Sequence, residues 1–148
     1  MNNYNQLKNK IKKNEGYKSE AYKDDLGFKT IGFGHLIKKK EKLLLNNIFT
    51  KKYLSLLFEE DFQNALKNYK KIYRKKNHPK EIKEIFIEMI YQLGIEGQKK
   101  FLKMNKYIEQ KKFFMAAYEM KKSLWYKQTP KRVDGLINFL LKRIYEKK

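Results

Sequence analysis

The sequence predicts an α+β fold that is mostly α-helical, with a small N-terminal β-sheet lobe and a C-terminal helical lobe joined by a long helix. Four of the seven glycines fall between residues 16 and 34, together with turn and strand residues. Elsewhere apolar residues recur almost throughout at helical spacing. One such stripe, over residues 50–73, is long enough at roughly 1.5 Å per residue to bridge two lobes.

The first part of the chain combines a short helix with strand residues. Tyr4, Leu7 and Ile11 lie on one face of a helix that is predicted to end at Gly16. Over residues 17–35, a turn signal and alternating β-forming residues predict a small sheet. Glycine in a strand often marks the close approach of a ligand or of another backbone, so this segment is a candidate site.

The rest of the chain is predicted to be helical. The long helix begins with Thr50 as its N-cap and ends near Tyr73. The next helix follows Pro79 and is closed by Gly94. The pair Thr129-Pro130 opens the last helix.

A single domain is expected over residues 1–148. Its two lobes are predicted at approximately 12–60 and at 1–11 plus 75–148, with the bridging helix at 50–73. A cleft between two lobes is the natural place for a ligand.

The chain carries 36 lysines and arginines against 16 acidic residues, a formal net charge of +20. This charge favours polyanions, so nucleic acid, anionic membrane surfaces and the acidic polymers of the bacterial wall are candidate partners. An ordinary solvated surface explains the charge equally well, because most of the excess is lysine. The absence of cysteine excludes disulfides, cysteine metal sites and cysteine nucleophiles.

The N-terminal segment indicates the cellular compartment in which the protein is expected to fold. Residues 1–16 are polar and basic without an apolar core, unlike a secretory signal, and no stretch of roughly 18 apolar residues occurs. We therefore expect the protein to fold as a monomer in the cytoplasm of a host cell. It would reach the periplasm or cell wall only when a separate factor releases it.

Glu15 and Asp24 are candidates for a catalytic pair of carboxyl groups. Glycoside hydrolysis usually needs one carboxylic acid that donates a proton and one carboxylate on the opposite face of the sugar. Glu15 is placed at the negative end of a helix, which disfavours its charged form, whereas the turn around Asp24 stabilises a charge. Taken alone, such a pair among sixteen acids is more often solvated surface.

Three blocks of the sequence form a distinctive pattern. Residues 15–36 contain the runs EG, YKD and TIGFGHL, residues 89–101 begin with MIYQLG, and residues 123–132 read SLWYKQTPKR. These blocks resemble the bacteriophage T4 lysozyme family, glycoside hydrolase family 24, in the family's order and over nearly the whole chain. The segment between residues 36 and 49 is shorter than in the type member of that family.

The resemblance implies a lysozyme-like fold and an endolysin-type muramidase. Such an enzyme hydrolyses the β-1,4 bond between N-acetylmuramic acid and N-acetylglucosamine in bacterial peptidoglycan, without a metal or other cofactor. At the matching positions, Glu15 is the general acid, Asp24 is the second carboxylate and Thr30 helps to position the attacking water. Hydrolysis in this family proceeds with inversion, which places the two carboxyl groups roughly 6.5–9.5 Å apart.

Three further positions are implied to support the catalytic set. Arg132 matches an arginine that pairs with the catalytic glutamate. His35 and Asp61 match an ion pair that ties a strand to the long helix. The alternative is a catalytic His–Asp dyad, but no serine or cysteine nucleophile is indicated nearby, so we expect the pair to be structural.

The resemblance also suggests residues that contact the substrate. These candidates are Leu36, Tyr91, Gln92, Met104 and Glu119. Tyr91 stands where the family commonly has phenylalanine, and Met104 and Glu119 stand where the type member has a serine and an asparagine. Trp125, the single tryptophan, is expected in the core rather than against a sugar.

Two other functions compete with the enzyme. A basic helical protein that binds nucleic acid would use the basic runs at 38–40 and 74–76, but no helix-turn-helix, zinc or RNP signature is present. We therefore expect no specific nucleic-acid partner. The last helix, residues 135–148, is basic and amphipathic and could act on membranes, although an ordinary packed terminal helix is favoured.

Overall fold

The computed structural model describes residues 4–146 and confirms the predicted α+β, mostly α-helical fold. The chain divides into two compact units, Met1–Leu66 and Lys67–Lys148, and the boundary between them falls within a helix. The predicted lobe limits, approximately 12–60 and 1–11 plus 75–148, stay a prediction. None of the helices among the described residues is long and apolar enough to cross a membrane.

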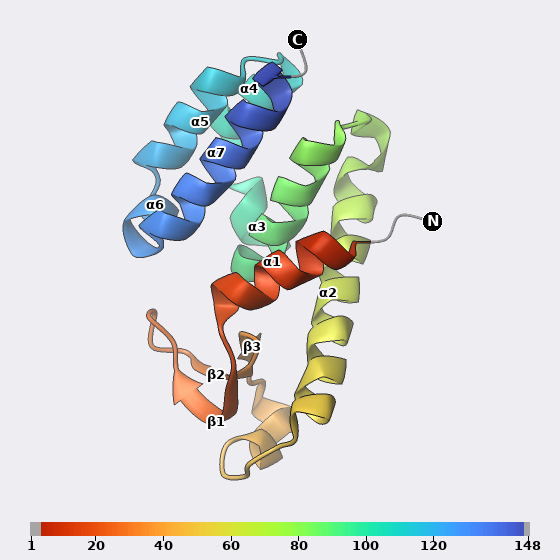
Figure 1. Ribbon diagram of the computed structural model, residues 1–148, viewed down its shortest axis with the longest axis vertical. Coiled ribbons are helices and arrows are strands. Elements are labelled where there is room, and N and C mark those ends of the chain that lie inside the picture. The colour runs from red at the N-terminus through yellow and green to blue at the C-terminus, as the bar shows by residue number, and fades with distance from the viewer. Residues whose placement is uncertain (1–3, 147–148) are drawn as a thin grey trace. The chain divides into compact units, whose positions relative to one another are not determined.

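The first unit contains a helix, a small sheet, a 3-10 helix and most of the long helix (Figure 1). The elements that begin in this unit are α1 (Asn5–Glu15), β1 (Lys18–Lys23), β2 (Lys29–Gly32), β3 (His35–Leu36), η1 (Lys39–Leu44) and α2 (Lys51–Tyr73). α1 ends at Gly16, which has a φ of 73°, as the sequence predicts. Thr50 caps α2, because its hydroxyl oxygen accepts a hydrogen bond of 3.1 Å from the backbone N–H of Tyr53.

The three strands form an antiparallel sheet in the order β1-β2-β3. Its register pairs Thr30 with Tyr22 on one side and with Leu36 on the other. These three side chains therefore share one row across the sheet. Ile31 and Phe33 are buried, but so is Thr30, so burial does not alternate along this part of the chain.

An aromatic cluster forms the core of the first unit. The ring centroids of Phe33 and Phe58 lie 5.8 Å apart, and those of Phe58 and Phe62 lie 6.3 Å apart. The ring of Tyr17 packs 5.0 Å from that of Phe33. Because Phe33 belongs to the turn between β2 and β3, the cluster fixes this turn against α2.

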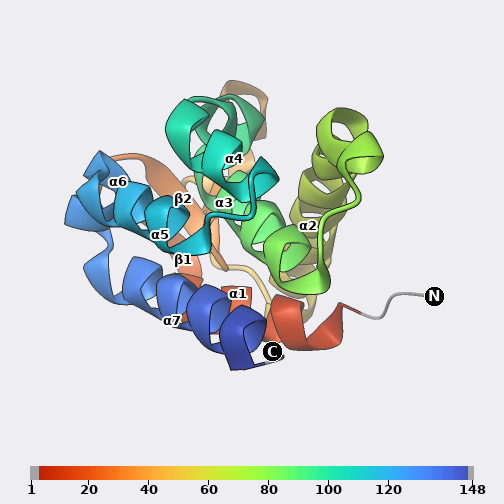
Figure 2. The same ribbon diagram turned by 90° about the horizontal axis from the view of Figure 1, so that it is seen from above.

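The second unit consists of the end of α2 and the helices that follow it. They are η2 (Arg74–Lys76), α3 (Lys80–Lys99), α4 (Leu102–Glu109), α5 (Phe113–Lys122), α6 (Leu124–Gln128) and α7 (Pro130–Glu146). α5 and α7 lie side by side (Figure 2). Gly94 ends the first helical stretch of α3, as predicted, because its φ of 77° and ψ of 164° are not helical, and a second stretch then continues as far as Lys99. Trp125 is buried in this unit, as predicted.

The aromatic cluster provides a test of the core. Phe58→Ala removes a ring that is 1% exposed and should lower the free energy of unfolding by about 3–5 kcal/mol, through lost burial and a remaining cavity. Leu56→Ala on the same helix is the matched control, because Leu56 is 64% exposed and should change the value by less than about 0.5 kcal/mol. If Phe58→Ala and Leu56→Ala lower the free energy of unfolding equally in urea denaturation, the aromatic cluster is not the core of this unit.

Candidate active site

Glu15 lies directly against the turn between β2 and β3. It is the last residue of α1, and its carboxyl group faces the backbone of Gly34, whose φ is 80°. A Cβ atom built on Gly34 would lie 2.8 Å from Cδ of Glu15 and 3.1 Å from its Cγ. The turn can therefore approach the carboxyl group this closely only with glycine at position 34.

Asp24 directly follows β1, and its own backbone turn holds its side chain. Its Oδ1 accepts hydrogen bonds from the backbone N–H groups of Leu26 (2.9 Å) and Phe28 (2.8 Å). The N–H of Gly27 donates to the carbonyl oxygen of Asp24 and closes the turn. Within residues 4–146, no hydrogen bond engages Oδ2 of Asp24, so this oxygen can accept one from water or a ligand.

Thr30 is oriented by the neighbouring backbone. Its hydroxyl donates a hydrogen bond of 2.9 Å to the carbonyl oxygen of Phe28, and the residue is only 2% exposed. The hydroxyl proton is thus already donated to the backbone, while the lone pairs of the oxygen can still accept a hydrogen bond from a water molecule. Leu36, its register partner on β3, is 51% exposed and presents an apolar side chain next to it.

Tyr22 connects the two predicted catalytic carboxyl groups electrostatically. Burial raises the pKa of its phenol, and the negative charges of Glu15, Asp24 and Asp25 raise it further. The sequence contains Tyr22 in the YKD run, but only the structure indicates that the charges of both Glu15 and Asp24 act on the pKa of its phenol.

His35 forms two ion pairs that tie the sheet to its surroundings. Its Nδ1 lies 2.7 Å from Oδ2 of Asp61 on α2, and its Nε2 lies 3.1 Å from Oε1 of Glu41 in η1. Burial lowers the pKa of His35, but the hydrogen bonds and charges of Asp61 and Glu41 outweigh this and raise it above the ordinary value of 6.5. Both ring nitrogens are occupied by carboxylates, which favours the structural role over a catalytic dyad. Sequence reasoning missed Glu41.

In the second unit, Gln92 is engaged by its neighbours. Its amide oxygen accepts a hydrogen bond of 2.8 Å from the indole Nε1 of Trp125. Its amide nitrogen donates to the hydroxyl of Thr129 at 3.4 Å. The amide of Gln92 thus links Trp125 and Thr129 by hydrogen bonds. Substrate contacts by Gln92 and by the half-buried Tyr91 stay predictions.

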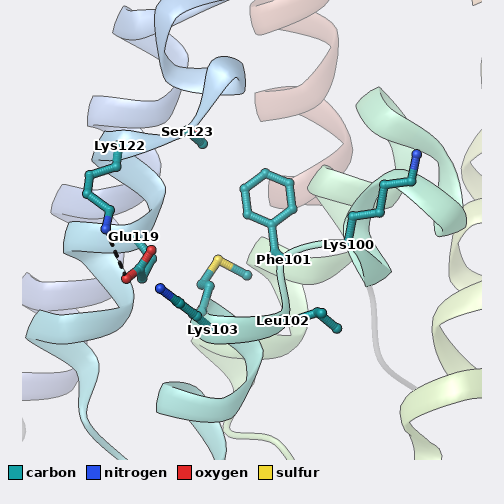
Figure 3. A pocket seen from close by; sticks show the side chains of 8 residues that line it. Lys100, Phe101, Leu102, Lys103, Glu119, Lys122 and Ser123 are labelled. Atoms are coloured by element: carbon teal, nitrogen blue, oxygen red, sulfur yellow. Dashed lines mark ion pairs between the residues drawn. The ribbon is translucent and has the colours of Figure 1, made fainter.

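Met104 and Glu119 line a hollow on the surface of the second unit (Figure 3). The hollow has a volume of about 370 Å³ and is also lined by Phe101 and Ser123. Met104 is 1% exposed, so a molecule in the hollow would meet mainly the other side chains. The carboxylate of Glu119 pairs with Lys122 at 3.4 Å, which leaves part of its charge neutralised.

Arg132 makes a buried ion pair that the sequence did not indicate. Its Nε donates a hydrogen bond of 2.9 Å to Oε2 of Glu88 on α3, and the side chain of Glu88 is fully buried. A glutamate on the apolar stripe of a predicted helix was the available signal for such a pair. The pairing of Arg132 with Glu15 stays a prediction, since these residues belong to different units.

The site in the first unit thus combines two carboxyl groups, a phenol, a hydroxyl and an apolar side chain. Such a set suits proton transfer and the positioning of water. The described residues include no group of three or more His, Asp or Glu arranged to hold a metal ion.

Comparison with known proteins places the chain in a family. The family model described as phage lysozyme matches residues 12–143, and the chain therefore belongs to the phage lysozyme family. It is 35% identical over 159 aligned residues to "Probable T4-type lysozyme 1" of Dictyostelium discoideum, covering 90% of this chain and 92% of that protein. It is 34% identical over 157 residues to "Probable T4-type lysozyme 2" of the same organism, covering 89% and 91%.

The approach of Gly34 to Glu15 can be tested with a matched glycine. Gly34→Ala and Gly27→Ala both place a side chain at a positive φ, at a cost of roughly 1–2 kcal/mol. Only at position 34 does the new methyl group meet the Glu15 carboxyl group, because nothing lies within 4 Å of it at position 27. We expect Gly34→Ala to be less stable than Gly27→Ala in chemical denaturation and to lose far more activity. Equal stability and equal activity of the two variants would contradict the contact between Gly34 and Glu15.

The His35 ion pairs predict a pH-dependent stability. Because the pKa of His35 is raised in the folded state, its stabilising effect is full below pH of about 6.5 and is lost as the pH rises through the raised pKa. Asp61→Asn should lower the free energy of unfolding by about 1.5–3 kcal/mol at pH of about 6 while leaving much of the activity.

The difference between wild type and Asp61→Asn should shrink as the pH is raised, and thermal unfolding over a pH series measures it. Glu60→Gln, at an exposed neighbouring position on α2, is the control and should show little difference at any pH. A folded but fully inactive Asp61→Asn variant would contradict the structural role.

Proposed function

We propose that the protein is a muramidase that hydrolyses the β-1,4 bond between N-acetylmuramic acid and N-acetylglucosamine in bacterial peptidoglycan. Membership of the phage lysozyme family and the names of its relatives support this. The geometric observation that supports it most is the contact between the Gly34 backbone and the Glu15 carboxyl group, which holds the proposed proton donor against the turn that follows the strand of Thr30.

In the proposed reaction, Glu15 donates its proton to the glycosidic oxygen as the bond from the anomeric carbon to that oxygen breaks. A water molecule attacks the anomeric carbon from the opposite face and gives a proton to Asp24. The two backbone N–H groups on Oδ1 of Asp24 orient the carboxylate and leave Oδ2 to receive this proton. Exchange with solvent then returns both carboxyl groups to their starting states. The new reducing end has inverted configuration.

The other residues of the site have positioning roles in this proposal. The Thr30 oxygen accepts a hydrogen bond from the attacking water, since its own proton is donated to the backbone. Leu36 offers an apolar surface to a sugar ring. The reaction needs only these side chains and water.

The biological setting is also a proposal. We infer that the enzyme acts as a monomeric endolysin, which folds in the cytoplasm of a host cell and reaches the wall after release by a separate factor. The net charge of +20 supports attraction to anionic wall or outer-membrane surfaces.

The proposed general acid can be tested on purified peptidoglycan. Glu15→Gln removes the transferable proton while keeping the shape, and should reduce cleavage by at least about 100-fold in a turbidity assay. Glu20→Gln, an exposed position on β1, is the matched control and should cleave at nearly the wild-type rate.

Retained cleavage by a folded Glu15→Gln variant would contradict the mechanism. Proton NMR of early products tests the stereochemistry, because inversion of a β-linked bond yields the α anomer first. Early appearance of the β anomer would exclude inversion.

A further inference from the structure

The connection between β3 and α2 is a well-anchored part of the first unit. In Figure 1 it is the light orange segment that leads into the start of α2 and contains η1. Leu44 is buried in a small core with Ile31 and Leu54. Glu41 is turned towards His35 and also accepts a hydrogen bond of 2.8 Å from the backbone N–H of Lys38. These contacts fix the backbone of the connection, and its exposed side chains therefore project from defined positions.

A basic hollow of about 610 Å³ lies along this connection. Its lining consists of lysines and two apolar residues: Lys29, Lys38, Lys39, Lys40, Lys42, Ile37 and Leu45. No acidic side chain belongs to the lining, and the nearby charge of Glu41 is directed at His35. Because five lysines contribute to the lining of one hollow, its surroundings attract anions and favour a ligand with several negative charges.

Two exposed apolar side chains accompany the lysines. Leu43 is 78% exposed and Ile48 is 76% exposed, the two largest values among the large apolar side chains of residues 4–146. Leu43 directly follows Lys42, a lining residue of the hollow, in the part of η1 after the kink at Glu41. A soluble polyanion would be bound by the lysines alone. Apolar side chains that project beside a basic cluster are typical of proteins that bind an anionic bilayer surface.

We propose that the connection from Lys38 to Ile48 docks on bilayers that contain anionic phospholipid. The lysines of the hollow bind lipid phosphate groups, and Leu43 and Ile48 enter the boundary between headgroups and acyl chains. Lysine suits this task because its mobile point charge follows a diffuse negative surface and needs no fixed bidentate partner. This docking site goes beyond glycan hydrolysis and uses none of the residues assigned to it.

The charged part of the site can be tested by co-sedimentation with vesicles of phosphatidylglycerol mixed with phosphatidylcholine. The triple variant Lys39→Gln, Lys40→Gln and Lys42→Gln should bind these vesicles on the order of 100-fold more weakly than wild type. The matched control is Lys67→Gln, Lys70→Gln and Lys80→Gln, which removes the same charge from exposed positions of the second unit and should bind almost as wild type does. Equal loss in both triple variants would overturn a local site.

The apolar part needs its own variant. Leu43→Ser with Ile48→Ser keeps the charge and should weaken vesicle binding about 10-fold. The control is Met115→Ser with Leu124→Ser, two exposed positions in the second unit, which should not weaken it. If only the lysine variant loses binding, or if the protein binds long-chain polyphosphate but no vesicles, the bilayer proposal is overturned. Equal binding to pure phosphatidylcholine vesicles would also overturn it.

Vesicle binding can be separated from catalysis. The Glu15→Gln variant should bind anionic vesicles as wild type does, because Glu15 lies outside the docking segment. Loss of the proposed muramidase function would therefore leave the vesicle measurements unchanged, and failure of vesicle binding would leave the cleavage assay unchanged.

Discussion

The contact between the Gly34 backbone and the Glu15 carboxyl group is the constraint on which the site depends. It requires α1 to end at Glu15, a turn with a positive φ at position 34, and an anchor that holds the turn in place. Phe33 supplies the anchor through its packing on Phe58. A carboxyl group in contact with a glycine backbone has little room to rotate, which suits the proposed role of Glu15 as a positioned proton donor. Thus the core of the unit and the proposed chemistry use the same few residues.

His35 is the second organising residue, since it joins three elements of the first unit. Asp61 holds one ring nitrogen from α2 and Glu41 holds the other from η1. The pairing with Glu41 has a consequence for the surface, because the one acidic residue of η1 turns inward and the outer side remains basic. The buried ring of His35 therefore stabilises the sheet through its two carboxylate partners and also defines the charge of the connection that follows it.

Several features could be predicted from local sequence because they depend on a few neighbouring residues. Gly16 ends a helix and Thr50 caps one. Gly94, with a φ of 77°, breaks the helical backbone where the sequence predicts a helix end. Only the structure shows that a second helical stretch follows it as far as Lys99.

The sequence by itself thus determined the class of fold, the order of its elements and the identity of the candidate carboxyl groups. Helix ends and turns follow from backbone hydrogen bonding and burial over short distances, which local residue types encode. Only the tertiary structure decided that His35 has Glu41 as a second partner and that Arg132 pairs with Glu88. It also decided which lysines surround one hollow. The physical reason is that charges select partners by distance in space, and that distance is set only when the elements pack together.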